Sequence, residues 1–121
     1  MTQTQILVVE DDPDIAAVMA QVLEEDLDAH VETAANGKEA LAFLEDHVPD
    51  AMLVNLRMPE MNGSDFLIAR RELDGPAALV PAVVVSAAPD GAGIAADVGA
   101  DGFLAKPFEI EALSAAVTRA L

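Results

Sequence analysis

Short apolar runs alternate along the chain with stretches in which apolar residues recur at helical spacing. The apolar runs are rich in valine, leucine and alanine and mostly lack polar alternation, which is typical of strands buried on both faces of a parallel sheet. The strand candidates are QILVVE (5–10), HVETA (30–34), DAMLVN (50–55), PAVVVSA (81–87) and GFLAK (102–106). The pattern therefore predicts five strands, each followed by a helix.

The helix starts carry recognisable capping residues. Asp12 precedes Pro13, which indicates an N-cap followed by proline at the first helical position. Asn36 has Glu39 three residues later, a capping-box pattern at the start of the second helix. The apolar periodicity of the first helix predicts one buried face, formed by Ile15, Val18, Met19, Val22 and Leu23.

The later helices are less regular. The third is predicted over about 64–73, ending near the sequence DGP, and the last begins near Glu109. The fourth contains Gly91 and Gly93, each of which costs roughly 1 kcal/mol relative to alanine in a helix interior. We therefore expect a short or mobile fourth helix.

The strict alternation of strands and helices predicts one α/β domain over residues 1–121, with a doubly wound parallel sheet covered by helices on both faces. Such sheets bind ligands beyond the carboxyl ends of their strands, where the strand order reverses. Two carboxylates, an amide, a hydroxyl and an ammonium group should meet at that edge. They belong to Glu10, Asp11, Asn55, Ser86 and Lys106.

Charge and composition exclude several classes of function. Twenty-two acidic residues against six basic ones give a formal charge of −16, which repels nucleic acids and anionic membranes. Solubility or adaptation to high salt accounts for most of this charge, although the cluster EDDPD is too dense for that explanation alone. Cysteine is absent, which excludes disulfides and thiolate chemistry. With no leader pattern and no membrane-length apolar segment, we expect a soluble, cytoplasmic protein.

Four ordered motifs carry a resemblance to a known family. They are ILVVEDD, LRMPEMNG, VVVSA and GADGFLAKPF, and the last contains Lys106, one of only two lysines in the chain. Over its whole length the chain resembles the receiver domain of bacterial two-component response regulators, including the chemotaxis regulator. The resemblance implies a flavodoxin-like three-layer fold with strand order 2-1-3-4-5.

The resemblance also implies a metal-assisted phosphoacceptor site. In the family, an aspartate before L-x-M-P attacks the phosphoryl group of a phosphohistidine on a sensor kinase, and Mg²⁺ neutralises charge. That aspartate corresponds to Asn55 in this chain. Asp11 is the implied direct metal ligand, Glu10 acts through water, and the backbone carbonyl of Arg57 completes the protein ligands. Hard oxygen ligands are those that Mg²⁺ prefers.

Further roles follow from the same resemblance. Ser86 is expected to bond a phosphoryl oxygen, Lys106 to pair with its charge, and Phe103 to take the place of the aromatic rotamer switch. Structural roles are implied for Pro59, Gly63 and Pro107, with a cis bond between Lys106 and Pro107.

Asn55 is the main departure from the family pattern. A carboxamide oxygen is a poor nucleophile, so we expect no phosphoryl acceptance in this form and no enzyme activity. The lost carboxylate should weaken Mg²⁺ affinity, and Lys106 should turn toward Glu10 or Asp11. The amide is either an engineered change in an active receiver or natural in a pseudo-receiver. Glu60 and Asn62 also replace the glycine and aspartate that are common in the family.

The expected partners are a sensor histidine kinase or a phosphotransfer protein, and an output domain or target protein contacted through the fourth and fifth helices. The alternative is an interaction module on the same fold that binds partners without phosphorylation. A flavodoxin-like cofactor binder or small enzyme is disfavoured, because the chain has no G-x-G-x-x-G or Walker loop and the predicted crevice is acidic.

Overall fold

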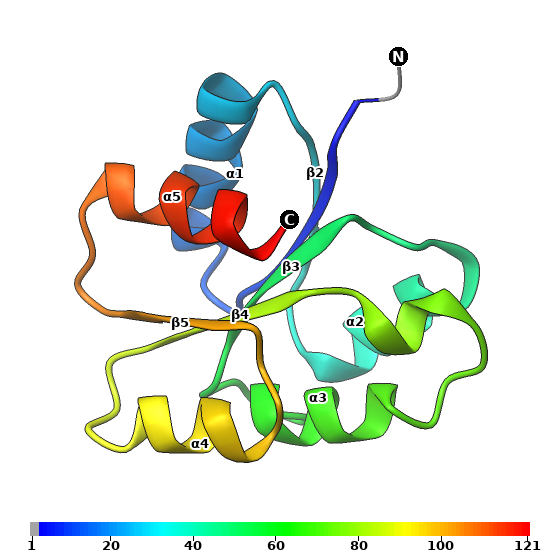
Figure 1. The fold of residues 1–121 in the computed structure, drawn as a ribbon. Coiled ribbons are helices and arrows are strands. Elements are labelled where there is room, and N and C mark those ends of the chain that lie inside the picture. The colour runs from blue at the N-terminus through cyan, green and yellow to red at the C-terminus, as the bar shows by residue number, and fades with distance from the viewer. Residues whose placement is uncertain (1–2) are drawn as a thin grey trace.

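Strands and helices alternate strictly along residues 3–121, the part of the chain that the computed structural model describes (Figure 1). The strands are β1 (Gln5–Val9), β2 (His30–Ala34), β3 (Ala51–Asn55), β4 (Ala82–Ser86) and β5 (Gly102–Ala105). The helices are α1 (Pro13–Leu27), α2 (Gly37–Asp46), α3 (Gly63–Arg70), α4 (Gly91–Asp97) and α5 (Ile110–Ala120), with a 3₁₀ helix, η1 (Pro76–Leu79), before β4. The predicted elements are confirmed to within a few residues at their ends.

The five strands form one parallel sheet in the order β2-β1-β3-β4-β5, which confirms the predicted topology. β3 and β4 lie in its interior, and all their residues are buried, as their apolar runs predict. Asn55 is opposite Val85, and Ser86 is opposite Ala105. This register brings the carboxyl ends of β3, β4 and β5 to the same edge.

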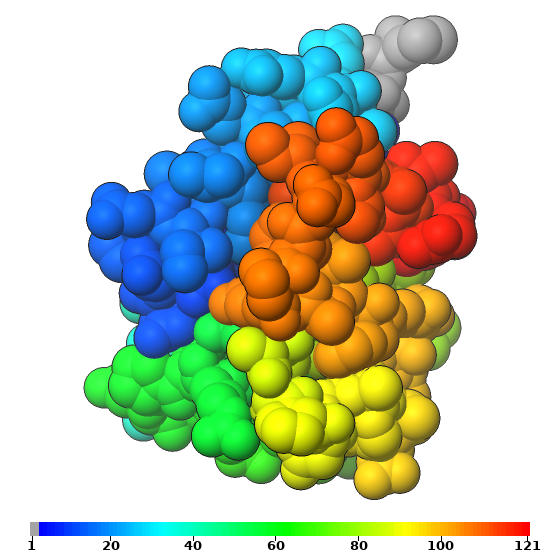
Figure 2. All heavy atoms as spheres, turned by 90° about the vertical axis from the view of Figure 1, so that its left-hand side faces the viewer, coloured from blue at the N-terminus to red at the C-terminus, as the bar shows by residue number. Residues whose placement is uncertain are grey.

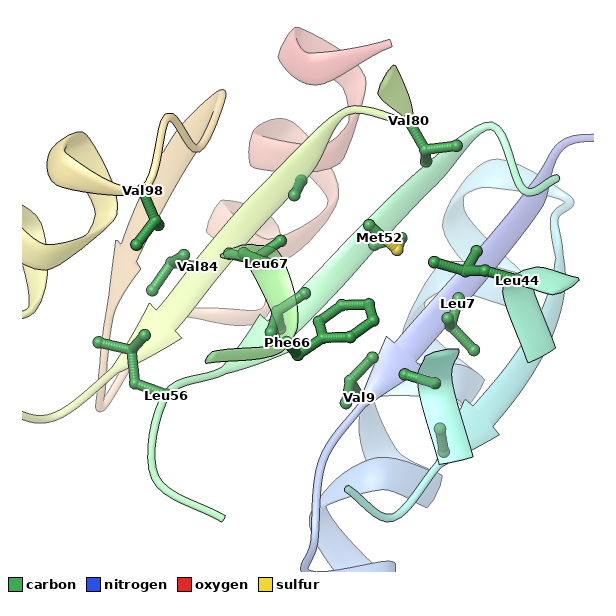
Figure 3. Packing of buried hydrophobic residues seen from close by; sticks show 14 of the residues in the cluster. Leu7, Val9, Leu44, Met52, Leu56, Phe66, Leu67, Val80, Val84 and Val98 are labelled. Carbon is green, nitrogen blue, oxygen red and sulfur yellow. The ribbon is translucent and has the colours of Figure 1, made fainter. Parts of the chain in front are cut away.

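Helices cover both faces of the sheet (Figure 1). On one face, α1 and α5 pack on a cluster that includes Leu23, Leu53 and Leu113. On the other face, Phe66 of α3 is fully buried against the sheet, near Met52 (Figure 3). The burial of apolar side chains between these layers fixes the sheet edge on which the site is built.

The predicted buried face of α1 is too wide, and two of its members are wrong. Ile15 is 38% exposed and Val18 is 57% exposed. The side chains that α1 buries fully are Ala16, Met19 and Leu23, whose spacing forms a narrow stripe along the helix. Ile15 and Val18 each lie one residue before a member of this stripe. Val18 is therefore turned about 100° from Met19 and further from the rest of the stripe, whereas Ile15, four residues before Met19, lies about 40° outside it at the margin of the stripe, because the helix has 3.6 residues per turn.

The third helix ends at Arg70, three residues before the predicted end. The backbone N–H groups of Arg71, Glu72 and Leu73 bond to carbonyls three residues back, so the last turn tightens instead of continuing the helix. Arg70 itself is buried, and its guanidinium donates to the carbonyl of Val80. Burial lowers the pKa of Arg70, and the nearby Asp101 opposes this shift. The fourth helix has seven residues, so the prediction that it is short is confirmed.

Candidate functional site

Loops that follow β1, β3, β4 and β5 adjoin one another on one face of the molecule (Figure 2). Glu10, Asn55 and Ser86 are buried at this face, Lys106 is partly buried and Asp11 is exposed. Asn55, Ser86 and Lys106 line a hollow of about 370 Å³ together with Arg57, Ala87, Ala88 and Pro89. The predicted convergence of these groups at the carboxyl edge of the sheet is confirmed.

The carboxamide of Asn55 is at the centre of the hydrogen-bond network. Its Nδ2 donates to Glu10 Oε2 at 3.2 Å, to Asp11 Oδ1 at 3.1 Å and to the carbonyl oxygen of Arg57 at 2.9 Å. Its Oδ1 accepts from Lys106 Nζ at 3.4 Å. Because one end of the amide meets only acceptors and the other end meets a cation, its two ends are not interchangeable.

Lys106 forms an ion pair with Glu10, as expected for a lysine that faces an amide in place of a carboxylate. The Nζ···Oε1 distance is 3.0 Å, and the side chain of Lys106 is 22% exposed while that of Glu10 is 2% exposed. The other carboxylate oxygen of Glu10 accepts from the backbone N–H of Asp12. This pair joins the end of β1 to the end of β5, and Asn55 at the end of β3 contacts both partners.

Ser86 and Phe103 lie on the α4 side of the site. Ser86 Oγ accepts from the backbone N–H of Ala88 at 3.0 Å. Phe103 is partly buried against the core, and a Cβ added to Gly91 would lie 2.9 Å from its ring and 3.1 Å from Ser86 Cβ. This contact was not predicted, because the helical pattern marks Gly91 only as a helix-weakening residue. The signal that could have indicated this close approach was a glycine at the start of a helix that follows a strand end.

The turn after β3 holds the backbone close to the site. Gly63 N–H donates to the carbonyl of Leu56, and a Cβ on Gly63 would lie 2.2 Å from the carbonyl oxygen of Asn55. Only glycine fits there without backbone movement. Glu60 has φ of 66°, which is the left-handed region that favours glycine. Pro59 is exposed in the same turn, and its structural role stays a prediction.

The last predicted backbone feature lies at the end of β5. The Lys106–Pro107 peptide bond is cis, as expected. Asp12 also has the predicted role, since its side chain caps α1 by accepting from the N–H groups of Asp14 and Ile15. Position 12 therefore serves the helix, whereas positions 10 and 11 serve the site.

The donor groups fit a magnesium ion only in part. The carboxylates of Glu10 and Asp11 and the carbonyl of Arg57 are hard oxygen donors of the kind Mg²⁺ prefers. Within residues 3–121, however, no three His, Cys, Asp or Glu side chains come together as a metal-binding group. Asn55 points its hydrogen-bearing nitrogen, not its oxygen, at these donors. In this arrangement Glu10, Asp11 and Arg57 offer oxygens that suit the cation, whereas the Asn55 amide is not oriented to bind it.

Comparison with known proteins identifies the family. Residues 6–118 match the family model described as the response regulator receiver domain. The chain is 33% identical over 122 residues to the response regulator Rre1 of Synechocystis, covering 96% of this chain and 51% of that protein. It is 34% identical over 119 residues to the transcriptional regulatory protein PrrA of Mycobacterium tuberculosis, covering 97% of this chain and 49% of PrrA. The chain thus spans about half the length of these curated relatives.

A solved structure agrees over the full length of both chains. The chemotaxis response regulator CheY4 of Vibrio cholerae has a TM-score of 0.89 and 31% sequence identity, covering 99% of this chain and 100% of that chain. No helix within residues 3–121 is both long and apolar enough to cross a membrane. The strand order and the match over residues 6–118 indicate the same family. The acidic residues, Ser86 and Lys106 lie where the motifs of that family predict them. This chain belongs to the response regulator receiver domain family.

Proposed function

We propose that this chain is a receiver of two-component signalling that does not accept a phosphoryl group at position 55 while that position is asparagine. The observation that carries the proposal is the carboxamide of Asn55 at the end of β3, in the hollow it shares with Ser86 and Lys106. By the family resemblance, this position belongs to the phosphoacceptor aspartate. The other residues to which the resemblance assigns roles at this site lie around an uncharged amide.

The chemistry of the amide supports this proposal. In phosphoryl transfer to a carboxylate, an anionic oxygen attacks phosphorus while the bond to the donor breaks, and an acyl phosphate results. The oxygen of a carboxamide carries only a partial negative charge, because the group as a whole is neutral, and its attack on phosphorus would not give an acyl phosphate. Asn55 Oδ1 also accepts a hydrogen bond from Lys106, which lowers its nucleophilicity further. On this basis the chain is a signalling domain without enzyme activity of its own.

Weak binding of Mg²⁺ is part of the same proposal. Receiver domains generally bind Mg²⁺, with acidic side chains supplying most of the protein ligands. In this chain Glu10 and Asp11 are the two anionic side chains at the site, and position 55 adds no third charge. Fewer anionic ligands lower the affinity for a divalent cation.

Intact-mass analysis after incubation with acetyl phosphate and MgCl₂ tests the phosphoacceptor proposal. We expect no mass change for the unsubstituted chain, and a gain of one phosphoryl group for Asn55→Asp, because that substitution restores the nucleophile among Ser86 and Lys106. Asn36→Asp, at the N-cap of α2, is the matched control and should gain nothing. Phosphorylation of the unsubstituted chain, or an unmodified Asn55→Asp variant, would contradict the proposal.

A second candidate function is a protein-interaction module that works without phosphorylation. The ion pair between Lys106 and Glu10 and its bonds to Asn55 favour this candidate, because the network is complete without a phosphoryl group. Receiver domains interact with histidine kinases or phosphotransfer proteins and with output domains. For this chain we propose a histidine kinase or a phosphotransfer protein as one partner. We propose an output domain or target protein that contacts α4 and α5 as the other.

Calorimetry with a candidate histidine kinase or phosphotransfer protein separates the two functions. An interaction module binds the unsubstituted chain and the unphosphorylated Asn55→Asp variant with similar affinity. A change of about tenfold or more on phosphorylation of the variant, which is about 1.4 kcal/mol, would favour an inherited phosphorylation switch instead.

A further inference from the structure

We propose that the side-chain NH₂ group of Asn55 replaces the divalent cation at this site, so that the domain is assembled without metal. The inference deepens the proposed function, since it concerns the same site. It adds that the site is a closed, metal-independent network and not merely a weakened metal site. Three distances, one orientation and one ion pair carry it.

The distances from Asn55 Nδ2 to the three oxygens are those of hydrogen bonds, and they are close to the spacing between neighbouring ligand atoms around a metal ion. They are 3.2, 3.1 and 2.9 Å, to Glu10, Asp11 and the carbonyl of Arg57. In an octahedral Mg²⁺ shell with bonds of roughly 2.0–2.1 Å, neighbouring ligand atoms lie about 2.9 Å apart. The nitrogen therefore occupies the place of a ligand atom. Its two hydrogens, directed at three acceptors, take the place of the positive charge among them.

The orientation of the amide opposes entry of a cation. Mg²⁺ binds oxygen, so coordination by Asn55 requires the amide to rotate and present Oδ1 to the cation. The rotation removes the three hydrogen bonds that the NH₂ group donates. It also places the NH₂ group where Oδ1 now lies, 3.4 Å from the ammonium group of Lys106. A donor facing an ammonium group has no hydrogen-bond partner there. Metal binding would thus compete with an arrangement that is already satisfied.

The ion pair completes the neutralisation. Glu10 is buried, and a buried carboxylate is costly unless it is paired and hydrogen-bonded. Lys106 Nζ supplies the charge at Oε1, and the amide hydrogens and the N–H of Asp12 reach Oε2. Every role that a cation would have toward Glu10 is therefore filled by groups of this chain.

Thermal unfolding in EDTA and in millimolar MgCl₂, followed by circular dichroism, tests the inference on three variants beside the unsubstituted chain. Asn55→Asp restores a ligand oxygen and a charge. Asn55→Ala removes the NH₂ group without adding a charge. Asn36→Asp is the control for added charge at a helix cap outside the site. Because the acidic surface responds to any divalent salt, the measured quantity is each variant's rise in Tm minus that of the unsubstituted chain.

We expect no extra rise for Asn36→Asp and an extra rise of about 4 °C or more for Asn55→Asp. Asn55→Ala decides between the two explanations of metal insensitivity. If the NH₂ group replaces the cation, its removal opens the site, and Mg²⁺ raises the Tm of this variant more than that of the unsubstituted chain. If the missing charge alone explains the insensitivity, Asn55→Ala responds no more than the unsubstituted chain, and the inference is overturned.

A strong, saturable Mg²⁺ response of the unsubstituted chain, equal to that of Asn55→Asp, would also overturn it. The metal inference is tested by unfolding temperatures measured without a phosphodonor, whereas the phosphoacceptor proposal is tested by intact mass. Failure of the metal inference and failure of the proposed function are therefore separately visible.

Discussion

Lys106 links the ends of two strands that lie far apart in the sequence. It pairs with Glu10, 96 residues away, across the carboxyl edge of the sheet. A buried acid that loses its partner remains as an uncompensated charge, which costs more than the loss of an exposed ion pair. The stability of the folded receiver therefore depends on a residue that the family resemblance associates with signalling.

Replacing Lys106 by methionine should lower the free energy of unfolding by about 2 kcal/mol, because the buried carboxylate of Glu10 keeps its hydrogen bonds at Oε2 but loses its cation and the bond from it at Oε1. The expected loss lies below the usual range for buried pairs, since the Lys106 side chain is 22% exposed. Urea unfolding at neutral pH measures the change. The matched control is Lys38→Met on the exposed start of α2, which should alter stability by no more than about 0.5 kcal/mol. Equal effects of the two substitutions would contradict this account.

Helix α4 contains two glycines that the structure distinguishes. A Cβ on Gly91, the first residue of the helix, would overlap Phe103 and Ser86, whereas a Cβ on Gly93 would meet no atom within 4 Å. The low helical propensity of glycine applies to both positions, but only Gly91 is required by packing. Gly91 is thus explained by its close approach to Phe103, whereas Gly93 only weakens the helix.

Replacing each of these glycines by alanine should therefore change the stability of the domain in opposite directions. Gly93→Ala should stabilise the domain by up to about 1 kcal/mol, because it removes backbone freedom at an open position. Gly91→Ala should destabilise it by about 1 kcal/mol or more, because the added methyl group overlaps the Phe103 ring. Parallel thermal and urea unfolding of the two variants measures the difference. A stabilised Gly91→Ala would show that Phe103 moves aside freely.

Charge acts on the molecule as a whole. A net charge of −16 on 121 residues makes the compact state repel itself, because folding brings the acidic side chains closer together. At the site, Lys106 offsets one of the two carboxylate charges and the neutral Asn55 amide donates to both Glu10 and Asp11, so most of the repulsion resides in the rest of the surface. Salt should then stabilise the domain in general while leaving the site network intact.

The Tm should rise by several degrees as NaCl is raised from low to near-molar concentration, since the Debye length falls from about 30 Å at 0.01 M to about 3 Å at 1 M. Thermal unfolding at fixed pH checks this expectation. KCl should give the same curve, because screening does not depend on the identity of the cation. A Tm that is unchanged or lower in salt would show that self-repulsion is not a significant term in the stability of this domain.

Consecutive residues were sufficient to predict the order of the elements, the parallel sheet and the groups at each strand end. These features are local, because side-chain period, caps and strand ends are set by neighbours in the chain. The amide at position 55 is likewise visible in the sequence. Ile15 and Val18 were misplaced because the width of a buried helix face depends on what packs against it.

The bonding within the site could be established only from the folded chain. The direction of the Asn55 amide and the partner of Lys106 depend on groups 44 to 96 residues apart, which the sheet brings together. The contact of Gly91 with Phe103 likewise needs α4 and β5 to be packed. Side-chain polarity is a local property, whereas the end of an amide that faces an acid is set by all the charges around it. For that reason the sequence predicted which groups meet, and the fold decided which atoms bond.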